Sequence, residues 1–503
     1  MAQAENVLFV VIDQLRADCL WGALAGHAVM PNIHALAADG MTFRNHYSVA
    51  NPCGPARASL LTGQYAMNHR SVRNGTPLPH DKPNLATEAR KAGYEPLLFG
   101  YTDIAKDPRT HHPNDPALRS YEEVIPGFNE IVEMRMEESI PWRAHLMNRG
   151  YDVPDYPDIF RPAGPRLDDP AFYRAEDSDT AFLTDQVISH LRARGSGWFA
   201  HVTYLRPHPP FVAPSPWNRL VDPASLPLPV GPAEREKACM IHPFVGPALG
   251  SLSAADMVEG FPDLDPTDQT IRTLRALYLG LAAEVDHHLG RLVAWLKDSG
   301  KYETTLIIVT ADHGEMLGDH HAWGKMHYLD PAWHVPLIVR DPRNLAARGM
   351  STDLPTESID VTPTILDWIG GKAPSTMNGV SLLPLLSGKT PADWRGHTVS
   401  ELDFGNPVEP TQWQKDLGLP AERCNLAILR TRSHTLVHFN GALPPLLFDR
   451  RNGPEAQDMA ADPSAAALLL DLTRRMLDHR MTHAEGLFAR TVATRHKAPD
   501  GSA

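Results

Sequence analysis

Two apolar runs, each followed by polar residues, constrain the fold of this chain more than any other feature of its sequence. The first run covers residues 6–12 and leads to Asp13-Gln14, and the second covers residues 304–310 and leads to Asp312-His313. Continuous apolar runs rich in β-branched residues are typical of strands buried on both faces of a parallel sheet. Ligands bind beyond the carboxyl ends of such strands, so we expect both polar pairs at one edge of the sheet.

The residue types in the two pairs indicate a metal site. If the two strands are neighbours, their polar side chains come within a few ångströms of one another, and oxygen-bearing groups are well placed there to hold a cation. Taken alone, Asp13 also fits a simpler role, in which a carboxylate at a strand end caps the turn that follows.

Strand and helix patterns alternate along most of the chain. Apolar runs at 94–100, 198–205 and 335–340 predict further strands, and amphipathic patterns predict helices at 31–40, 84–92, 180–194, 268–297 and 358–369. The alternation predicts an α/β fold with a large, mostly parallel sheet flanked by helices.

The chain is expected to comprise two units. Residues 1–384 form the large α/β unit, with proline-rich insertions at about 104–178 and 206–266 over the carboxyl edge of the sheet. Beyond residue 384, short apolar runs alternate with turns, which favours an antiparallel sheet. Residues 385–503 are therefore predicted to form a smaller α+β subdomain with a helix at 464–481 and a flexible tail after about residue 494.

Charge and cysteine usage narrow the possible partners and setting. The formal net charge of -13 argues against nucleic acid, because binding to a phosphate backbone needs a basic surface. No apolar run is long enough for a signal peptide or a membrane span. The four cysteines are far apart and match no disulfide or metal spacing, so a reducing cytoplasm is the expected setting.

Residues 51–63 predict a loop that leads into a helix. Pro55 suits the first helical turn, and Gly63 can adopt the left-handed conformation that ends a helix. Cys53 then lies at the positive end of the helix dipole, where a negative charge is favoured, and Arg57 lies one turn further on the same face. A buried structural cysteine near a helix start is the alternative.

The string Cys53-Gly54-Pro55-Ala56-Arg57 with Leu60-Leu61-Thr62-Gly63 resembles the C-x-P-x-R signature of the sulfatase family, which belongs to the alkaline phosphatase superfamily. That family oxidises the cysteine to formylglycine. Blocks at 10–14, 310–314, 324–325, 447–451 and 454–455 follow in sulfatase order, so the resemblance covers nearly the whole chain.

Within the family the chain is most similar to the bacterial phosphonate monoester hydrolases, which also cleave phosphodiesters. The similarity rests on Gln14 where typical arylsulfatases have a second aspartate, on Asn51 before the Pro-Cys pair, on Tyr101, and on the segment Arg206-Pro207-His208-Pro209-Pro210-Phe211. The resemblance implies an alkaline phosphatase-like fold and hydrolysis of phosphonate monoesters and phosphodiesters, with promiscuity toward sulfate esters.

The resemblance also implies the ligands of one divalent metal ion. These are Asp13, Gln14, Asp312, His313 and an oxygen of the hydrated formylglycine at position 53. Oxygen ligands with one imidazole fit Mn²⁺ or Ca²⁺ better than zinc, and residue types do not choose between those two ions.

The implied chemistry assigns roles to further residues. A metal lowers the pKa of a bound hydroxyl, so that one oxygen of the formylglycine hydrate attacks phosphorus, and the second hydroxyl allows the product to be released. Arg57, Asn74 and Lys325 neutralise the non-bridging oxygens, while His208 or Lys325 protonates the leaving group. Tyr101 and Asp103 are expected to contact the substrate.

Asp103 departs from the family pattern, because the phosphonate hydrolases place Tyr-x-Thr where this chain has Tyr101-Thr102-Asp103. The carboxylate could act as a base when product is released, or it could repel dianionic substrates. We favour repulsion, which would select monoanionic diesters and phosphonate monoesters over dianionic phosphate monoesters.

Two other functions remain open at this point. One is an arylsulfatase, since sulfate monoesters carry one negative charge and need the same groups. The other is a non-catalytic anion-binding protein on a retained fold. The implied partners are a small anionic ester, a formylglycine-generating enzyme during maturation, and further copies of the chain in a homotetramer. Residues 403–424 are predicted to form either an arm that reaches a neighbouring subunit or an ordinary surface loop.

Overall fold

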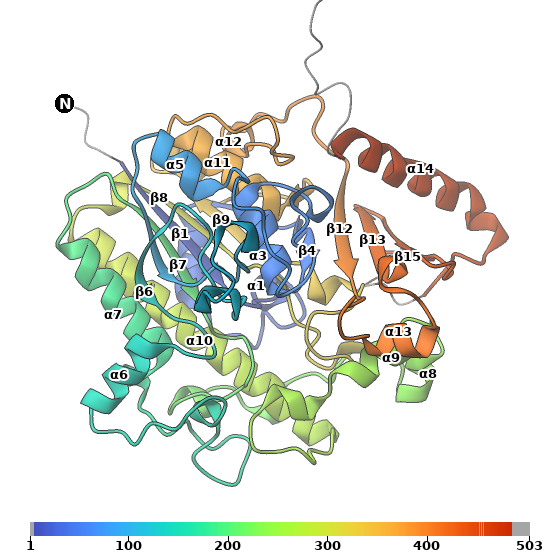
Figure 1. The fold of residues 1–503 in the computed structure, drawn as a ribbon, viewed down its shortest axis with the longest axis horizontal. Helices are drawn as coiled ribbons and strands as arrows, with labels where there is room; N and C mark the ends of the chain where they lie inside the picture. Colours follow the sequence, from blue (N-terminus) through green and yellow to red (C-terminus); the bar gives the residue numbers. More distant parts are fainter. Residues whose placement is uncertain (1–4, 452, 454, 456, 485–503) are drawn as a thin grey trace, which may run out of the picture.

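A twisted sheet of eight strands lies at the centre of the molecule (Figure 1). The computed structural model describes residues 5–451, 453, 455 and 457–484. The strands follow the order β10-β2-β9-β8-β1-β7-β5-β6. They are β1 (Asn6–Ile12), β2 (Met41–Phe43), β5 (Pro96–Gly100), β6 (Asn129–Glu133), β7 (Phe199–Tyr204), β8 (Thr305–Thr310), β9 (Leu337–Arg340) and β10 (Met350–Thr352).

The sheet is mostly parallel, as the apolar runs predict. β1 pairs in parallel with both β7 and β8, and β5 pairs in parallel with β6 and β7. β9 runs antiparallel to β8 and β2. In register, Val11 lies opposite Thr310, so the carboxyl ends of β1 and β8 meet at the same edge of the sheet.

Both faces of the sheet are covered by helices, which explains why all seven residues of β1 are buried. Leu8, Val10 and Ile12 pack into one core with α2 (Pro31–Ala38), α7 (Asp179–Arg192) and α10 (Asp268–Asp298). The alternate residues Val7, Phe9 and Val11 pack into a second core with α3 (Cys53–Thr62), α5 (Leu85–Lys91), α11 (Val361–Trp368) and α12 (Leu383–Leu386). The alternation follows from the two-residue period of a strand.

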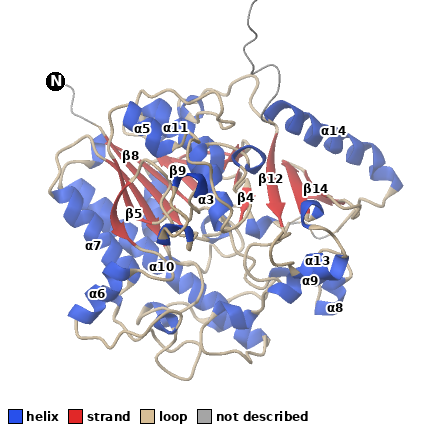
Figure 2. Cartoon of the chain, viewed as in Figure 1, coloured by secondary structure: helices blue, strands red, loops and turns tan. Residues whose placement is uncertain are grey.

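A second sheet of five strands, with the order β15-β14-β13-β12-β4, lies beside α3 (Figure 2). Four of its strands are antiparallel and come from the C-terminal part of the chain: β12 (His397–Asp403), β13 (Asn425–Thr431), β14 (His434–Phe439) and β15 (Leu446–Asp449). α14 (Ala466–His483) packs on this sheet through Leu472 and Met476. The fifth strand, β4 (Ala50–Asn51), directly precedes α3 and pairs in parallel with β12.

The remaining elements are short. β3 (His46–Tyr47) and β11 (Thr356–Glu357) form a two-stranded sheet. The other helices are α1 (Asp18–Trp21), α4 (Ala66–His69), α6 (Ile140–Asn148), α8 (Arg235–Cys239), α9 (Val245–Ser251) and α13 (Gln412–Leu417). Within the described residues, no helix combines the length and the apolar character that a membrane span needs.

The predicted fold class is confirmed, and the five predicted strands of the large sheet agree with the observed ones within two residues at each end. The domain boundaries remain predictions, and the expected tail after residue 494 lies outside the described residues. The segment expected to be the first insertion contributes β6, the edge strand of the large sheet. In the segment 403–424, the Trp413 indole donates a hydrogen bond to the Phe244 carbonyl oxygen at 3.0 Å, so this part packs on its own chain.

Candidate active site

Cys53 is the first residue of α3, and this end of the helix faces the residues that follow β8, because Cys53 Sγ contacts His313. Gly63 ends the helix as predicted, with a φ of 64° and its N–H donating to the Ser59 carbonyl oxygen. Gly54 N–H donates to Asn74 Oδ1 at 2.9 Å. A Cβ at position 54 would lie 3.1 Å from this oxygen and 3.1 Å from the Asp103 carbonyl oxygen, so a glycine permits the close approach.

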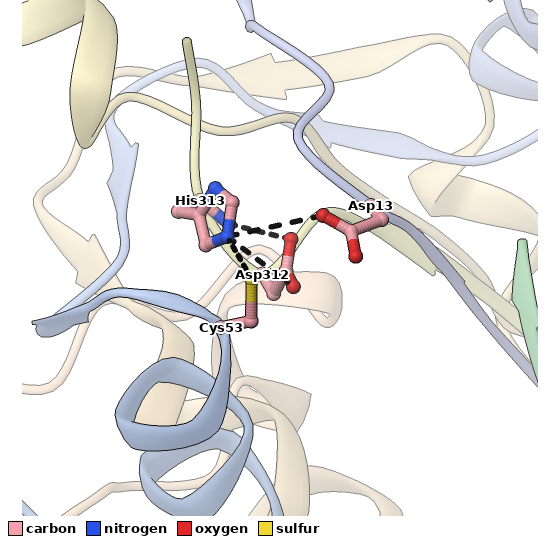
Figure 3. Close-up of side chains that lie close together, drawn as sticks. All are labelled: Asp13, Cys53, Asp312 and His313. Carbon is pink, nitrogen blue, oxygen red and sulfur yellow. Dashed lines mark hydrogen bonds and ion pairs between the residues drawn. The ribbon is translucent and has the colours of Figure 1, made fainter. Parts of the chain in front are cut away.

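Four side chains converge in front of this helix end, and Figure 3 shows them pointing toward one another. Asp13 follows β1, and Asp312 and His313 follow β8. Together with Cys53 they offer ligand atoms that all lie within 4.8 Å of one another. The polar pairs at the ends of two neighbouring strands therefore meet, as predicted.

The hydrogen bonds of His313 orient its ring. Nδ1 lies 3.1 Å from the Gly314 carbonyl oxygen, which can only accept, so Nδ1 carries the hydrogen. Nε2 therefore presents its lone pair to the cluster, where Cys53 Sγ lies 3.2 Å away. Burial lowers the pKa of His313 to about 4, which keeps the ring neutral and able to bind a metal.

The donor set fits a divalent cation. Asp13 Oδ1 is buried and has no hydrogen-bond partner among the residues that the structure describes. Asp312 Oδ2 accepts no hydrogen bond either, although it forms an ion pair with Arg57 Nη2 at 2.9 Å. Buried carboxylate oxygens without a donor are costly, and a cation bound between them removes that cost. Two carboxylates and one imidazole are ligand types that divalent cations use in proteins.

Arg57 is held among three carboxylates behind the cluster. Its Nη2 lies 3.1 Å from Asp13 Oδ2 and 2.9 Å from Asp312 Oδ2, and its Nε lies 3.6 Å from Asp103 Oδ2. The guanidinium lies over the Tyr101 ring, 4.2 Å from its centre, and donates to the Tyr101 hydroxyl at 3.1 Å. That hydroxyl donates to Asp13. Tyr101 therefore holds both a cation and a candidate metal ligand in place.

Burial and charge act differently on the three carboxylates. Burial opposes ionisation of Asp312, but the positive charge of Arg57 and the hydrogen bond from the Gln14 N–H outweigh it and lower the pKa of Asp312, as does His313 when its ring is protonated at low pH. Burial and the charge of Asp312 raise the pKa of Asp13. Burial also raises the pKa of Asp103, against the attraction of Arg57. Added positive charge at this place would therefore be favourable.

Gln14 is held by all four of its polar groups. Its N–H donates to Asp312 Oδ1 at 3.1 Å, and its carbonyl oxygen accepts from the Tyr278 hydroxyl at 2.8 Å. The side-chain Oε1 accepts from Lys325 Nζ at 2.7 Å, while Nε2 donates to Glu315. The backbone has a φ of 65°, an unfavourable conformation for a residue other than glycine, which these four bonds stabilise.

Lys325 also contacts His208, with 3.0 Å between Nζ and Nε2. Nδ1 of His208 lies 2.6 Å from the Pro209 carbonyl oxygen and so carries the hydrogen of the neutral ring. Burial, followed by the charge of Lys325, lowers the pKa of His208 well below its usual value. The main chain at Lys325 is fixed as well, because Asn51 Nδ2 donates to its carbonyl oxygen at 3.0 Å.

The structure brings the predicted site residues together around Cys53. Ten of them form one connected set of contacts: Asp13, Gln14, Cys53, Arg57, Tyr101, Asp103, His208, Asp312, His313 and Lys325. Asn74 reaches the set through the Gly54 N–H.

Two further residues support the site and were not predicted to do so. Glu315 accepts a hydrogen bond from the side chain of Gln14. Its position in the sequence, two residues after His313, is the feature that could have indicated a role in the site. Arg206 donates to the carbonyl oxygens of His208 at 3.2 Å and Pro210 at 2.8 Å, and pairs with Asp179 at 2.9 Å. Arg206 therefore holds the loop that carries His208.

The sheet and the metal-binding cluster define a hydrolase of the alkaline phosphatase-like α/β class. The chain belongs to the sulfatase family, whose model matches residues 5–371. A second family model, N-sulphoglucosamine sulphohydrolase, C-terminal, matches residues 318–482. The family implies a divalent metal and a formylglycine, and the cluster described above fits such a metal.

Similar proteins cover the chain almost from end to end. The multifunctional alkaline phosphatase superfamily protein PehA from Trinickia caryophylli is 37% identical over 99% of this chain and 98% of its own length. The phosphonate monoester hydrolase SpPMH from Silicibacter pomeroyi is 57% identical, with a TM-score of 0.94 and 96% of each chain covered. The phosphonate monoester hydrolase of Agrobacterium radiobacter is 39% identical, with a TM-score of 0.92 over 97% of this chain and 98% of that one.

Proposed function

We propose that this protein hydrolyses phosphonate monoesters and phosphodiesters, and sulfate esters more slowly, with a formylglycine made from Cys53 as the nucleophile. The observation that carries the proposal is the position of Cys53 Sγ, 3.2 Å from His313 Nε2 and within a cluster of metal-binding side chains. The names of the two phosphonate monoester hydrolases at 57% and 39% identity support the choice of substrate.

Asp13, Gln14, Asp312 and His313 would hold one Mn²⁺ or Ca²⁺ ion. When bound, such an ion supplies Lewis acidity at the reacting oxygens. The formylglycine hydrate supplies an attacking oxygen and a second hydroxyl, which a serine lacks. The residues of the chain itself bind and orient the ester and transfer protons.

Arg57 supplies fixed positive charge beside the nucleophile. Its contacts with Asp13, Asp103 and Asp312 hold the guanidinium in place before a substrate binds. A cation that is already oriented stabilises charge that develops on the non-bridging oxygens of phosphorus. Asn74 fixes the main chain at Gly54, next to the nucleophile, through its bond to the Gly54 N–H.

Lys325 is the proton donor to the leaving oxygen in this proposal, and His208 orients it. The one N–H of the neutral His208 ring donates to the Pro209 carbonyl oxygen, so His208 Nε2 can only accept from Lys325. As the bond between phosphorus and the leaving oxygen breaks, that oxygen takes a proton from Lys325 Nζ, and water then reprotonates the amine.

Maturation has to precede complete folding. Cys53 is 4% exposed at the buried start of α3, so a formylglycine-generating enzyme would need to act on the segment 51–63 before it packs. Mass spectrometry of the Cys53 peptide from the native host tests this step. We expect the aldehyde or its hydrate, and an unmodified thiol there would contradict the proposal.

Substrate choice is tested by kinetics on one preparation. We expect kcat/KM for an aryl phosphonate monoester and an aryl phosphodiester to exceed kcat/KM for the matching aryl sulfate. The reverse order would favour an arylsulfatase, and no turnover by the modified, metal-loaded protein would favour a non-catalytic anion-binding protein.

We also propose that the protein is a cytoplasmic homotetramer. The support is the resemblance to the phosphonate monoester hydrolases and a cysteine spacing that matches no disulfide framework. Light scattering of the purified protein tests the assembly, and a monomer at micromolar concentration would contradict it.

A further inference from the structure

The side-chain amide of Gln14 has two ends of similar shape, and only the oxygen end can bind a metal. The residues that contact the amide determine which end faces Lys325 and which end faces Glu315. Lys325 Nζ, 2.7 Å from Oε1, has only hydrogens to donate, and a carboxylate oxygen of Glu315 faces Nε2. The reversed amide would set N–H groups against an ammonium and an oxygen against a carboxylate, so the hydrogen-bond network permits one orientation.

Glu315 is fully buried and is itself held in place by the main chain. Its second oxygen accepts from Leu317 N–H at 3.0 Å and from Gly324 N–H at 2.6 Å. Its own N–H donates to the Pro331 carbonyl oxygen at 3.0 Å. Every group that binds the carboxylate is a donor, so Glu315 acts at each contact as an acceptor.

We propose that Glu315 is a positioning residue that selects the amide orientation of Gln14 and thereby makes Gln14 a competent metal ligand. The inference deepens the proposed function, because it rests on Gln14 as a ligand of the divalent ion. The same carboxylate holds the two ends of the segment 317–324, which leads directly to Lys325. One buried side chain therefore sets the position of Gln14 and of the lysine that contacts it. Outer hydrogen-bond partners of metal ligands typically contribute about 10–100-fold to metal affinity.

The variant Glu315→Gln separates this role from simple support of the segment 317–324. A glutamine keeps the shape of the side chain, and its oxygen can still accept from Leu317 and Gly324 N–H. Its NH₂ group, however, would then face Nε2 of Gln14, so two donors would oppose each other. Turning the Gln14 amide relieves that conflict, and it presents Nε2 instead of Oε1 on the side of Lys325.

The second variant, Gln14→Glu, supplies the rescue. A carboxylate has an oxygen at both ends, so in the double variant Gln14→Glu/Glu315→Gln one oxygen accepts from the new amide at position 315, while the other takes the place of Oε1 beside Lys325 and keeps a lone pair for the metal. Alone, Gln14→Glu places two carboxylates against each other, and we expect it to be impaired. Glu284→Gln, a Glu-to-Gln change at another fully buried position, is the matched control.

The experiment is titration calorimetry of Mn²⁺ into the wild type and the four variants, prepared from one host with the state of Cys53 checked by mass spectrometry. We expect Glu315→Gln to weaken Mn²⁺ affinity about 10–100-fold, the double variant to recover most of the loss, and the control to match the wild type. Thermal unfolding without metal is measured in parallel.

Unchanged affinity in Glu315→Gln overturns the inference, and so does a double variant that binds no better than Glu315→Gln. The inference is also overturned if Glu315→Gln and the double variant both lose metal affinity together with stability in the absence of metal, because a purely structural role predicts that pattern. Hydrolysis is assayed separately. A wild type that binds Mn²⁺ but does not cleave phosphonate monoesters contradicts the proposed function and leaves this inference intact.

Discussion

Lys325 Nζ lies 3.0 Å from His208 Nε2, and the only N–H hydrogen of the neutral His208 ring faces the Pro209 carbonyl oxygen instead. In the mechanism proposed above, the proton that reaches the leaving group therefore comes from the lysine. A histidine next to a catalytic position is commonly assigned as the general acid. The donor and acceptor roles in this pair indicate the opposite assignment.

The first prediction concerns the leaving group. Lys325→Met should lower kcat/KM by about 10²–10⁴ for esters with poor leaving groups such as alkoxides, and by much less for nitrophenolate esters, which need no proton. His208→Gln should have a smaller effect on the same series. The measurement is the slope of log kcat/KM against the leaving-group pKa, at saturating Mn²⁺. Lys237→Met, at an exposed lysine, is the control, and equal slopes in wild type and Lys325→Met would contradict the assignment.

The second prediction concerns Asp103, whose Oδ2 lies 3.6 Å from Arg57 Nε. Asp103→Asn removes the carboxylate and keeps its shape, and asparagine tolerates the φ of 51° found here, whereas β-branched threonine does not. We expect the ratio of kcat/KM for phosphate monoesters to that for diesters to rise about tenfold, which corresponds to about 1.4 kcal/mol. An unchanged ratio in Asp103→Asn would show that this residue does not select substrate charge.

The third prediction concerns Gly314, between the candidate ligand His313 and Glu315. A Cβ at this position would lie 1.9 Å from the Pro331 carbonyl oxygen, so the main chain has to move to accept alanine. Gly314→Ala should lower the free energy of unfolding by about 1–3 kcal/mol and weaken metal binding. Chemical denaturation measures the first effect. Gly26→Ala, where nothing lies within 4 Å of the new methyl group, should change neither quantity.

The fourth prediction is a pH dependence of stability that arises from Glu284 in α10. Burial, followed by the charge of Asp179, raises the pKa of Glu284 to about 8 from an ordinary value of 4.5. Between these two values the folded protein binds more protons than the unfolded chain. This group's contribution to stability is therefore fully present below pH 4.5 and is lost as pH rises through about 8.

Glu284→Gln should remove that contribution. We expect the variant to lose less stability than the wild type between about pH 5 and pH 9, where one such group changes the free energy of unfolding by at most about 1.4 kcal/mol per pH unit. Urea denaturation across this range is the measurement. Glu234→Gln, at an exposed ion pair with Lys237, should keep the wild-type slope, and parallel curves for all three proteins would refute the prediction.

The fifth prediction concerns metal removal. A ligand that binds only the folded state stabilises it by about 2.7 kcal/mol when its free concentration is about 100 times Kd. Chelation should therefore lower the Tm of the wild type, and added Mn²⁺ should restore it. Asp312→Asn removes a carboxylate from the cluster and should make Tm much less sensitive to both treatments. A Tm of the wild type that does not respond to chelation or to Mn²⁺ would exclude the proposed site.

The strands of the large sheet that were predicted are those whose burial on both faces produces a continuous apolar run in the sequence. β1 and β8 are buried on both faces and read as unbroken apolar runs. β6 was missed, because it lies at the edge of the sheet and only Val132 among its five residues is buried. β4 was missed because two residues are too short for a pattern.

The convergence of Asp13, Asp312 and His313 could be predicted because these residues follow strands whose order places their carboxyl ends together. The residues that hold those side chains in place could not be predicted. Gln14 and Glu315 are 301 positions apart, and nothing in the segment around either residue indicates the other. Arg206 likewise acts through Asp179, which a separate helix carries. Such pairs depend on tertiary packing, which local periodicity does not encode.

β4 pairs with β12, a strand that the ribosome synthesises much later. Ala50 and Asn51 find their partners only in Glu401 and Leu402, about 350 residues later in synthesis. At about 5–20 residues per second that delay is on the order of tens of seconds. Throughout it, the strand that leads into Cys53 has no neighbour in its sheet. In the proposed maturation, a modifying enzyme would have at least this interval in which to act, and the distance along the chain between two short strands sets its length.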